Sequence, residues 1–166
     1  MVLGGAILAG CGRSEQSRID FKMGESVPNP PLTYTVIDTA WQTQLGQGFK
    51  VRVPQNRFLL ITLSVTNGSA HDALLPLYSI EDGTGKTYME LESGEGVDNW
   101  FGILRNLAPA QTNQGVLLFD VPLSSYRMKL PNGGPAGEER YVTVEIPLRI
   151  DSESTVQTPL PGSVFK

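Results

Sequence analysis

The chain has 166 residues, of which 40% are hydrophobic and 18% charged, and its formal net charge is −4. This length suits one globular domain with a proper core, and the acidic balance excludes the basic footprint of a nucleic-acid-binding protein. One cysteine and one histidine exclude an intramolecular disulfide and remove most metal and catalytic chemistry, so we expect no metal, no cofactor and no enzyme. Eighteen glycines and twelve prolines favour an all-β fold with frequent turns.

The chain begins with an apolar stretch that is typical of a targeting signal. Residues 1–10 are too few to span a bilayer as a helix, which needs about 20 residues, but they fit the apolar region and cleavage site of a secretory signal. The sequence Leu8-Ala9-Gly10-Cys11 resembles the lipobox of bacterial lipoproteins. The resemblance implies cleavage before Cys11, a lipid on its thiol, and a chain anchored in the cell envelope that faces outside the cytoplasm.

This stretch departs from a normal signal in one respect, because no Lys or Arg precedes the apolar residues. A signal usually begins with a positive region, so the departure indicates a start assigned late or a truncated sequence. The alternative interpretation is a buried N-terminal strand that contains an ordinary cysteine.

The remaining chain divides into three parts by composition. Residues 11–29 begin with the lipidated cysteine and continue as a polar, unpatterned stretch, which we interpret as a flexible tether. Residues 30–150 carry the alternating apolar pattern of a folded domain. Residues 151–166 are polar with two prolines and predict a loose tail.

The folded part is organised around two predicted strands. Residues 58–67 alternate apolar and polar side chains and include several β-branched residues, which predicts a strand with one buried face. Residues 116–121 repeat the pattern, and we expect this strand to pair with the first or to face it across the core. In chain order, the other predicted strands are 32–40, 49–53, 73–80, 86–91, 126–130 and 141–150, and 100–104 is a short strand or a helical turn. The turn signals between these stretches predict an immunoglobulin-like antiparallel β-sandwich of seven to eight strands, with a closed barrel as the alternative.

The order of several pieces resembles a known family. The pieces are Tyr34-Thr-Val36, Phe58 to Asn67, Leu77 to Tyr88, Asn106-Leu-Ala-Pro109, Gly115 to Pro122 and the last alternating strand. They resemble the telokin-like, immunoglobulin-like domains of unknown function of bacterial lipoproteins and secreted mycobacterial antigens, over residues 19–150. The resemblance implies an immunoglobulin-like sandwich outside the cell and brings no catalytic residues.

Four short motifs resemble known sites but fit turns and strand ends better. The Gly-Lys-Thr triplet at 85–87 lacks both the earlier glycine and the following helix of a phosphate-binding loop. The acidic residues within 81–92 lack the ligand spacing of a calcium loop. His71 and Asp72 are adjacent on a loop, without a nucleophile elbow. The Asn-Gly-Ser triplet at 67–69 matches a glycosylation sequon, but we interpret it as a turn.

The most suggestive binding feature is the loop 92–99 with the two aromatic residues that follow it. Loops at the ends of a sandwich often carry binding, and Trp is favoured at interface anchors. We therefore expect Asp98, Asn99, Trp100 and Phe101 to form a binding loop. The alternative is that the two rings cap the open end of the core.

Other side chains leave the same choice open. Trp41, Tyr78 and Tyr126 are either core residues or exposed anchors. Asp120, inside the second central strand, either points outward or accepts hydrogen bonds from a neighbouring loop, because a buried carboxylate must be paired.

Anchor, tether and missing catalytic groups together predict a non-enzymatic, lipid-anchored domain outside the cytoplasm. We expect its partners to be the membrane, through the lipid on Cys11, and an envelope protein, peptide or glycan, with 92–114 and 131–139 as contact surface. The alternative is a sensor domain that binds a small molecule or a metal through acidic end loops. A hydrolase would need a site assembled only in three dimensions.

Overall fold

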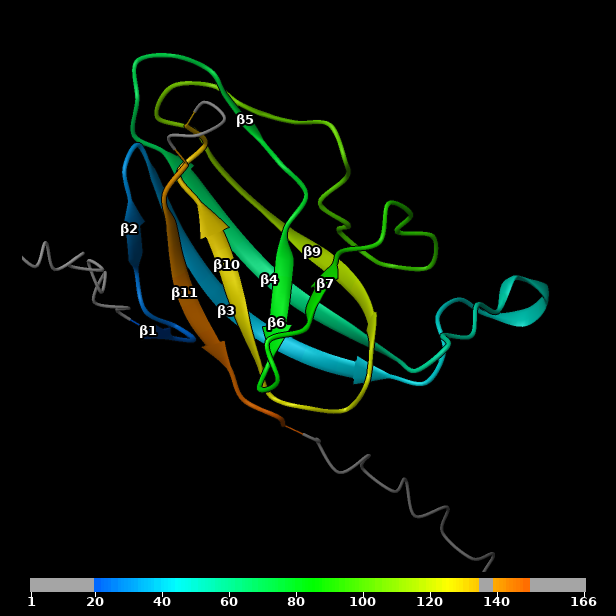
Figure 1. Cartoon of the computed structure of the whole chain (residues 1–166). Coiled ribbons are helices and arrows are strands. Elements are labelled where there is room, and N and C mark those ends of the chain that lie inside the picture. Colours follow the sequence, from blue (N-terminus) through cyan, green and yellow to red (C-terminus); the bar gives the residue numbers. More distant parts are fainter. Residues whose placement is uncertain (1–19, 135–138, 150–166) are drawn as a thin grey trace, which may run out of the picture.

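The computed structural model describes residues 20–134 and 139–149, and these form eleven strands and one turn of 3-10 helix, Gly48–Lys50 (Figure 1). The predicted signal, Cys11 and the predicted tail therefore lie outside the described residues. In chain order the strands are β1 (Asp20–Lys22), β2 (Val27–Asn29), β3 (Leu32–Gln42), β4 (Arg57–Asn67), β5 (Ala73–Leu75), β6 (Ser79–Asp82), β7 (Thr87–Met89), β8 (Arg105–Leu107), β9 (Thr112–Val121), β10 (Tyr126–Pro131) and β11 (Tyr141–Ile146).

Two sheets pack against each other to form a β-sandwich. One has the strand order β1-β11-β10-β6-β7 and the other the order β2-β3-β4-β9, and β5 pairs with β8 in a small third sheet (Figure 1). Neighbouring strands are antiparallel except β1 and β11, which are parallel. The predicted all-β sandwich is confirmed, and the predicted number of strands, seven to eight, was too low.

The two predicted central strands, β4 and β9, lie side by side. Their antiparallel register places Leu59 opposite Phe119 and Ile61 opposite Leu117, and all four side chains are buried. β3 pairs with the other edge of β4 over its full length, with one irregularity near Val36. Alternation along these long strands therefore builds one wall of the core.

The core lies between the two large sheets. Its largest fully buried side chains are Tyr34, Tyr78, Phe119, Leu32, Leu59, Ile61, Leu63, Leu75, Ile80, Leu107 and Leu117. The rings of Tyr34 and Tyr78 meet edge to face with centroids 6.2 Å apart. Tyr34 also donates a 2.6 Å hydrogen bond to the carbonyl of Pro131, so polar contacts as well as apolar packing join the two sheets.

A second, smaller cluster lies on the outer face of the sheet that contains β4 and β9. Phe58 and Leu118 are buried there together with Leu45. Alternation explains their position, because neighbours in a strand point to opposite faces. The loops 43–56 and 90–104 cover this cluster, so both loops are packed against the sheet at their bases.

Several predicted boundaries were wrong. Residues 49–53 form no strand; they belong to a hairpin whose base is the bridge between Leu45 and Arg52. The stretch 73–80 is interrupted after β5 by Pro76, whose missing N–H cannot join a ladder. β1 and β2 lie inside the stretch 11–29 that we interpreted as a tether, so the sandwich begins before residue 30.

Candidate functional site

The predicted binding loop is built into the sandwich rather than standing free of it. Phe101 is only 8% exposed and belongs to the core, and its N–H donates to the carbonyl of Val116 at 3.0 Å. The N–H of Val116 donates in turn to the carbonyl of Asn99 at 2.9 Å. The segment 99–101 thus pairs along the outer edge of β9.

Two glycines make room for the aromatic rings. A Cβ at Gly94 would lie 2.0 Å from the indole of Trp100, and a Cβ at Gly115 would lie 2.6 Å from the ring of Phe101. The indole Nε1 of Trp100 is buried and has no hydrogen-bond partner among the residues described. Phe101 therefore acts in packing, as the alternative interpretation expects, and Trp100 is half-buried. Asp98 and Asn99 are exposed, and a binding role for this loop stays a prediction.

A buried ion pair closes the base of this loop. The guanidinium of Arg105 contacts both carboxylate oxygens of Glu90 at 2.7 Å, and the two side chains are 1% and 0% exposed. Glu90 also accepts the N–H of Tyr78 at 2.6 Å. The guanidinium carbon lies 5.0 Å from the ring centroid of Phe101. No sequence signal identifies this pair, because its members come from two segments that only the fold brings together.

The remaining motifs behave as structural features. The triplet 85–87 lies in the turn between β6 and β7. Asn67 is fully buried and its side-chain nitrogen donates to the carbonyl of Leu107 at 2.9 Å, which fits the turn interpretation rather than a glycan site. Asp72 accepts a hydrogen bond from Asn106 at 3.0 Å. Within the two described ranges, no group of three or more His, Cys, Asp or Glu side chains could hold a metal.

The structure shows the positions of Asp120 and of the aromatic residues that the sequence left open. The carboxylate of Asp120 accepts the N–H groups of Gln55 and Asn56 at 2.6 and 2.8 Å, so of the two alternatives the structure shows the hydrogen bonds from a neighbouring loop. Tyr78 and Tyr126 are buried in the core. Trp41 is half-buried and packs against that core.

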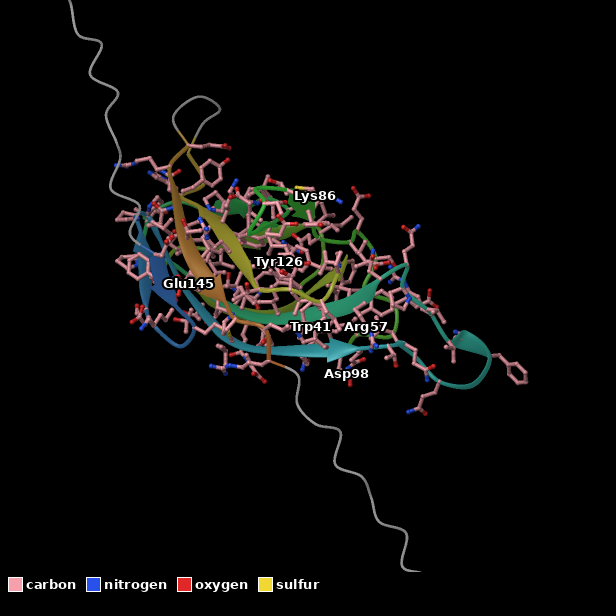
Figure 2. All side chains as sticks on the ribbon, turned by 60° about the horizontal axis from the view of Figure 1, so that its bottom comes forward. Trp41, Arg57, Lys86, Asp98, Tyr126 and Glu145 are labelled. Atoms are coloured by element: carbon pink, nitrogen blue, oxygen red, sulfur yellow. The ribbon has the colours of Figure 1, made fainter. Side chains whose placement is uncertain are left out.

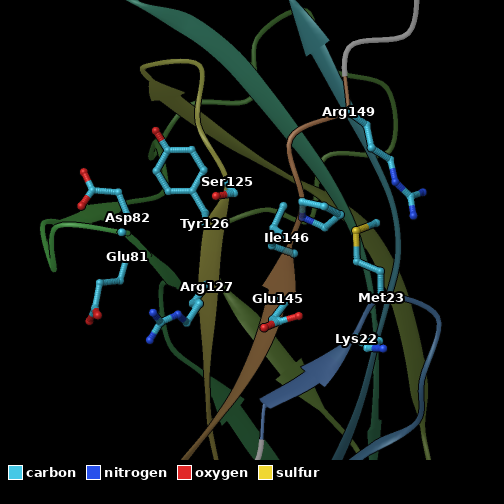
Figure 3. A pocket seen from close by; sticks show the side chains of 12 residues that line it. Lys22, Met23, Glu81, Asp82, Ser125, Tyr126, Arg127, Glu145, Ile146 and Arg149 are labelled. Carbon is cyan, nitrogen blue, oxygen red and sulfur yellow. The ribbon is translucent and has the colours of Figure 1, made fainter.

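The structure reveals a cavity that the sequence did not predict. It has a volume of about 530 Å³ and lies where β1, β6, β10 and β11 end or begin, at one end of their sheet (Figure 3). Met23, Tyr126 and Ile146 contribute its apolar surface. Tyr126 donates its hydroxyl proton to the carbonyl of Pro122 at 2.6 Å, and burial raises the pKa of Tyr126 to about 12. This phenol therefore stays neutral and faces the cavity with its ring.

A row of charges crosses the sheet at the rim of the cavity. The strand register places Arg127 between Glu81 and Glu145, and Glu145 beside Lys22. Arg149, just after β11, adds a third cation to the lining. Positive and negative side chains therefore alternate along this row, with Arg127 opposite two carboxylates and Lys22 opposite one.

Two of the three acidic residues at the rim are already engaged. Asp82 accepts the N–H of Thr84 at 2.9 Å and that of Lys86 at 3.1 Å, within its own turn. The hydroxyl of Thr84 is the main cause that lowers the pKa of Asp82. Glu81 lies 2.6 Å from the amino group of Lys129. The cavity lining therefore holds three cations, with Glu145 as the acidic neighbour that Arg127 and Lys22 share.

None of the helices in the described part of the chain is both long and apolar enough to span a membrane.

Comparisons with known proteins identify a family and a fold. The model of a domain of unknown function, DUF4352, matches residues 21–141. No curated protein matches the chain. Similar solved structures include the yjhA protein of Bacillus subtilis, with 14% identity and a TM-score of 0.60 over 76% of this chain and 98% of that one.

Two further similar structures are described as a secreted protein and a candidate lipoprotein. The secreted protein MPT63 of Mycobacterium tuberculosis has 17% identity and a TM-score of 0.53 over 78% of this chain and 98% of that one. The candidate lipoprotein ycdA of Bacillus subtilis has 14% identity and a TM-score of 0.55 over 75% of this chain and 38% of that one. At these identities the likeness concerns the fold.

Proposed function

The chain belongs to the DUF4352 family of domains of unknown function, and from that membership we propose a non-enzymatic binding domain held outside the cytoplasm by a lipid on Cys11. The lipobox-like sequence before Cys11 supports the anchor. The secreted protein and the candidate lipoprotein that share the fold support a location outside the cytoplasm. The telokin-like, immunoglobulin-like relationship is part of this proposal.

The binding role depends on one observation, the cavity of about 530 Å³ beside β10 and β11. Ligand pockets have volumes of this order and combine apolar walls with a few polar groups. Here the apolar side chains of Met23 and Ile146 share the lining with the cations of Lys22, Arg127 and Arg149 (Figure 3). Guanidinium groups bind carboxylates with two parallel hydrogen bonds. The ligand class that fits is a small organic anion with an apolar group, such as the carboxyl end of a peptide from the envelope.

Thermal unfolding with matched ligands tests this role. The probes are N-acetyl-leucine and its uncharged amide, which differ only in the carboxylate. A ligand at a hundredfold excess over its Kd stabilises the native state by about 2.7 kcal/mol, so we expect the acid to raise Tm and the amide to leave it unchanged. Arg127→Gln should abolish the shift.

The matched control is Arg140→Gln, because Arg140 is exposed and does not line the cavity. This variant should keep the full shift. An equal shift with the amide, or a shift that survives Arg127→Gln, would contradict an anion site at this cavity.

A further inference from the structure

A hairpin between β3 and β4 presents apolar side chains that nothing in the described chain covers. Phe49 is fully exposed, with a relative exposure of 111%, and Val53 is 72% exposed. Both lie within residues 43–56, which project beyond the sandwich with the 3-10 turn at their tip (Figure 1). A single exposed apolar residue is ordinary, but an exposed aromatic side chain at the tip of a projecting hairpin is a candidate contact for a binding partner.

The hairpin is held in place rather than loose. Leu45 and Arg52 exchange two backbone hydrogen bonds of 2.9 and 2.8 Å, and the Leu45 side chain is buried in the smaller cluster. Gly46 has φ +78°, and a Cβ there would lie 2.3 Å from the carbonyl oxygen of Lys50. The tight turn thus requires a glycine, and the fold holds the tip, with Phe49, out in solvent.

Arg52 strengthens the base of the same hairpin. Its guanidinium carbon lies 5.4 Å from the ring centroid of Phe58, and its side chain donates to the carbonyl of Ser93 at 2.8 Å. The hairpin is therefore fixed to the sheet and to the neighbouring loop, which reduces the ordering cost of inserting its tip into a partner.

The charge of the hairpin is opposite to that of the chain. Residues 43–56 contain no Asp or Glu, whereas Lys50 and Arg52 supply two cations in a chain of net charge −4. One acidic side chain contacts the hairpin at its base. Asp120 binds the N–H groups of residues 55 and 56.

The acidic loop 92–99 also meets the hairpin at its base. A Cβ on Gly96 would lie 2.9 Å from the backbone nitrogen of Gly46. Figure 2 shows the hairpin projecting beyond Arg57 and away from the labelled Asp98. The tip itself, residues 47–53, therefore combines an exposed aromatic ring with positive charge.

We propose that this hairpin is a membrane contact, which inserts Phe49 into the surface of an anionic lipid bilayer while Lys50 beside it faces the headgroups. Aromatic and cationic side chains together are typical of interfacial insertion, and anionic lipids attract each nearby cation. A convex tip suits a bilayer, which needs no matching pocket. The contact is separate from the lipid on Cys11 and does not depend on it.

The test is partitioning of the full chain onto vesicles, in a Cys11→Ser background that cannot be lipidated. Vesicles of equal phosphatidylglycerol and phosphatidylcholine should bind the protein, and pure phosphatidylcholine should bind it more weakly. Phe49→Ala should lower the partition coefficient roughly tenfold or more, and Lys50→Glu should lower it about tenfold. Near-ultraviolet circular dichroism checks that each variant is folded.

Leu104→Ala is the matched control, because Leu104 is 91% exposed and lies on a different loop. It should leave partitioning unchanged. The proposal is overturned if Phe49→Ala binds vesicles as the parent does, if Leu104→Ala loses as much affinity, or if neither vesicle type binds the parent. Because the test contains no acyl chain, its failure would leave the proposed anchor and the cavity untouched.

Discussion

At the scale of single residues, the strongest constraint is the buried pair of Glu90 and Arg105. Neither side chain reaches water, and the pair fixes the turn before β6, the end of β7 and the start of β8 through one guanidinium. Arg105 also donates to the carbonyls of Gly102 and Pro76. Removing one partner of a buried ion pair strongly destabilises the folded state, whereas removing one partner of a surface ion pair changes its stability little.

Removing one partner should therefore destabilise the domain. We expect Arg105→Met to lower the free energy of unfolding by roughly 3–5 kcal/mol, because Glu90 is left charged and buried. Urea unfolding followed by fluorescence measures the change. Lys129→Met, which breaks the partly exposed pair with Glu81, should cost no more than about 1 kcal/mol. Equal losses in the two variants would contradict the role of the buried pair.

The glycines beside the aromatic rings also act as single residues. Gly94→Ala would place a methyl group inside the volume of the Trp100 ring. We expect a loss of roughly 1–3 kcal/mol from overpacking and a change in tryptophan fluorescence. Gly83→Ala is the control, since a Cβ there has nothing within 4 Å. A Gly94→Ala variant as stable as Gly83→Ala would show that Trp100 does not pack there.

At the scale of elements, the long strands were predictable and the short ones were not. β4 buries one face along its whole length and β9 does so from Gly115 to Val121, so period-two alternation identifies them. β1, β2 and β8 have three residues each, which is too short for a pattern. The strand conformation of β1 and β8 also depends on partners distant in sequence, as when Asp20 pairs with Thr143.

Loops were the other source of error at this scale. The alternation Phe49, Val51, Val53 resembles an edge strand, yet positive φ at Gly46 and Gly48 turns the chain into a hairpin. The aromatic residues at 100 and 101 follow a polar loop, which suggested a binding surface. Whether an aromatic ring faces solvent or core depends on the glycines it meets, and those contacts are set by the fold.

At the scale of the molecule, composition and turn spacing were enough to predict an all-β sandwich. They were not enough to predict the cavity, because its lining comes from the ends of four strands spread between residues 22 and 149. The charged row across Glu81, Arg127 and Glu145 likewise exists only once β6, β10 and β11 are paired. A site assembled across a sheet leaves no local motif.

The anchor on Cys11 underlies the proposed location of the whole molecule, and intact mass spectrometry tests it directly. The chain, produced in a bacterium with an intact signal sequence, is compared with its Cys11→Ala variant in the membrane fraction. We predict a mass that corresponds to cleavage before Cys11 plus acyl chains, and loss of this species in the variant. An unmodified, uncleaved chain in the cytosol would contradict the account.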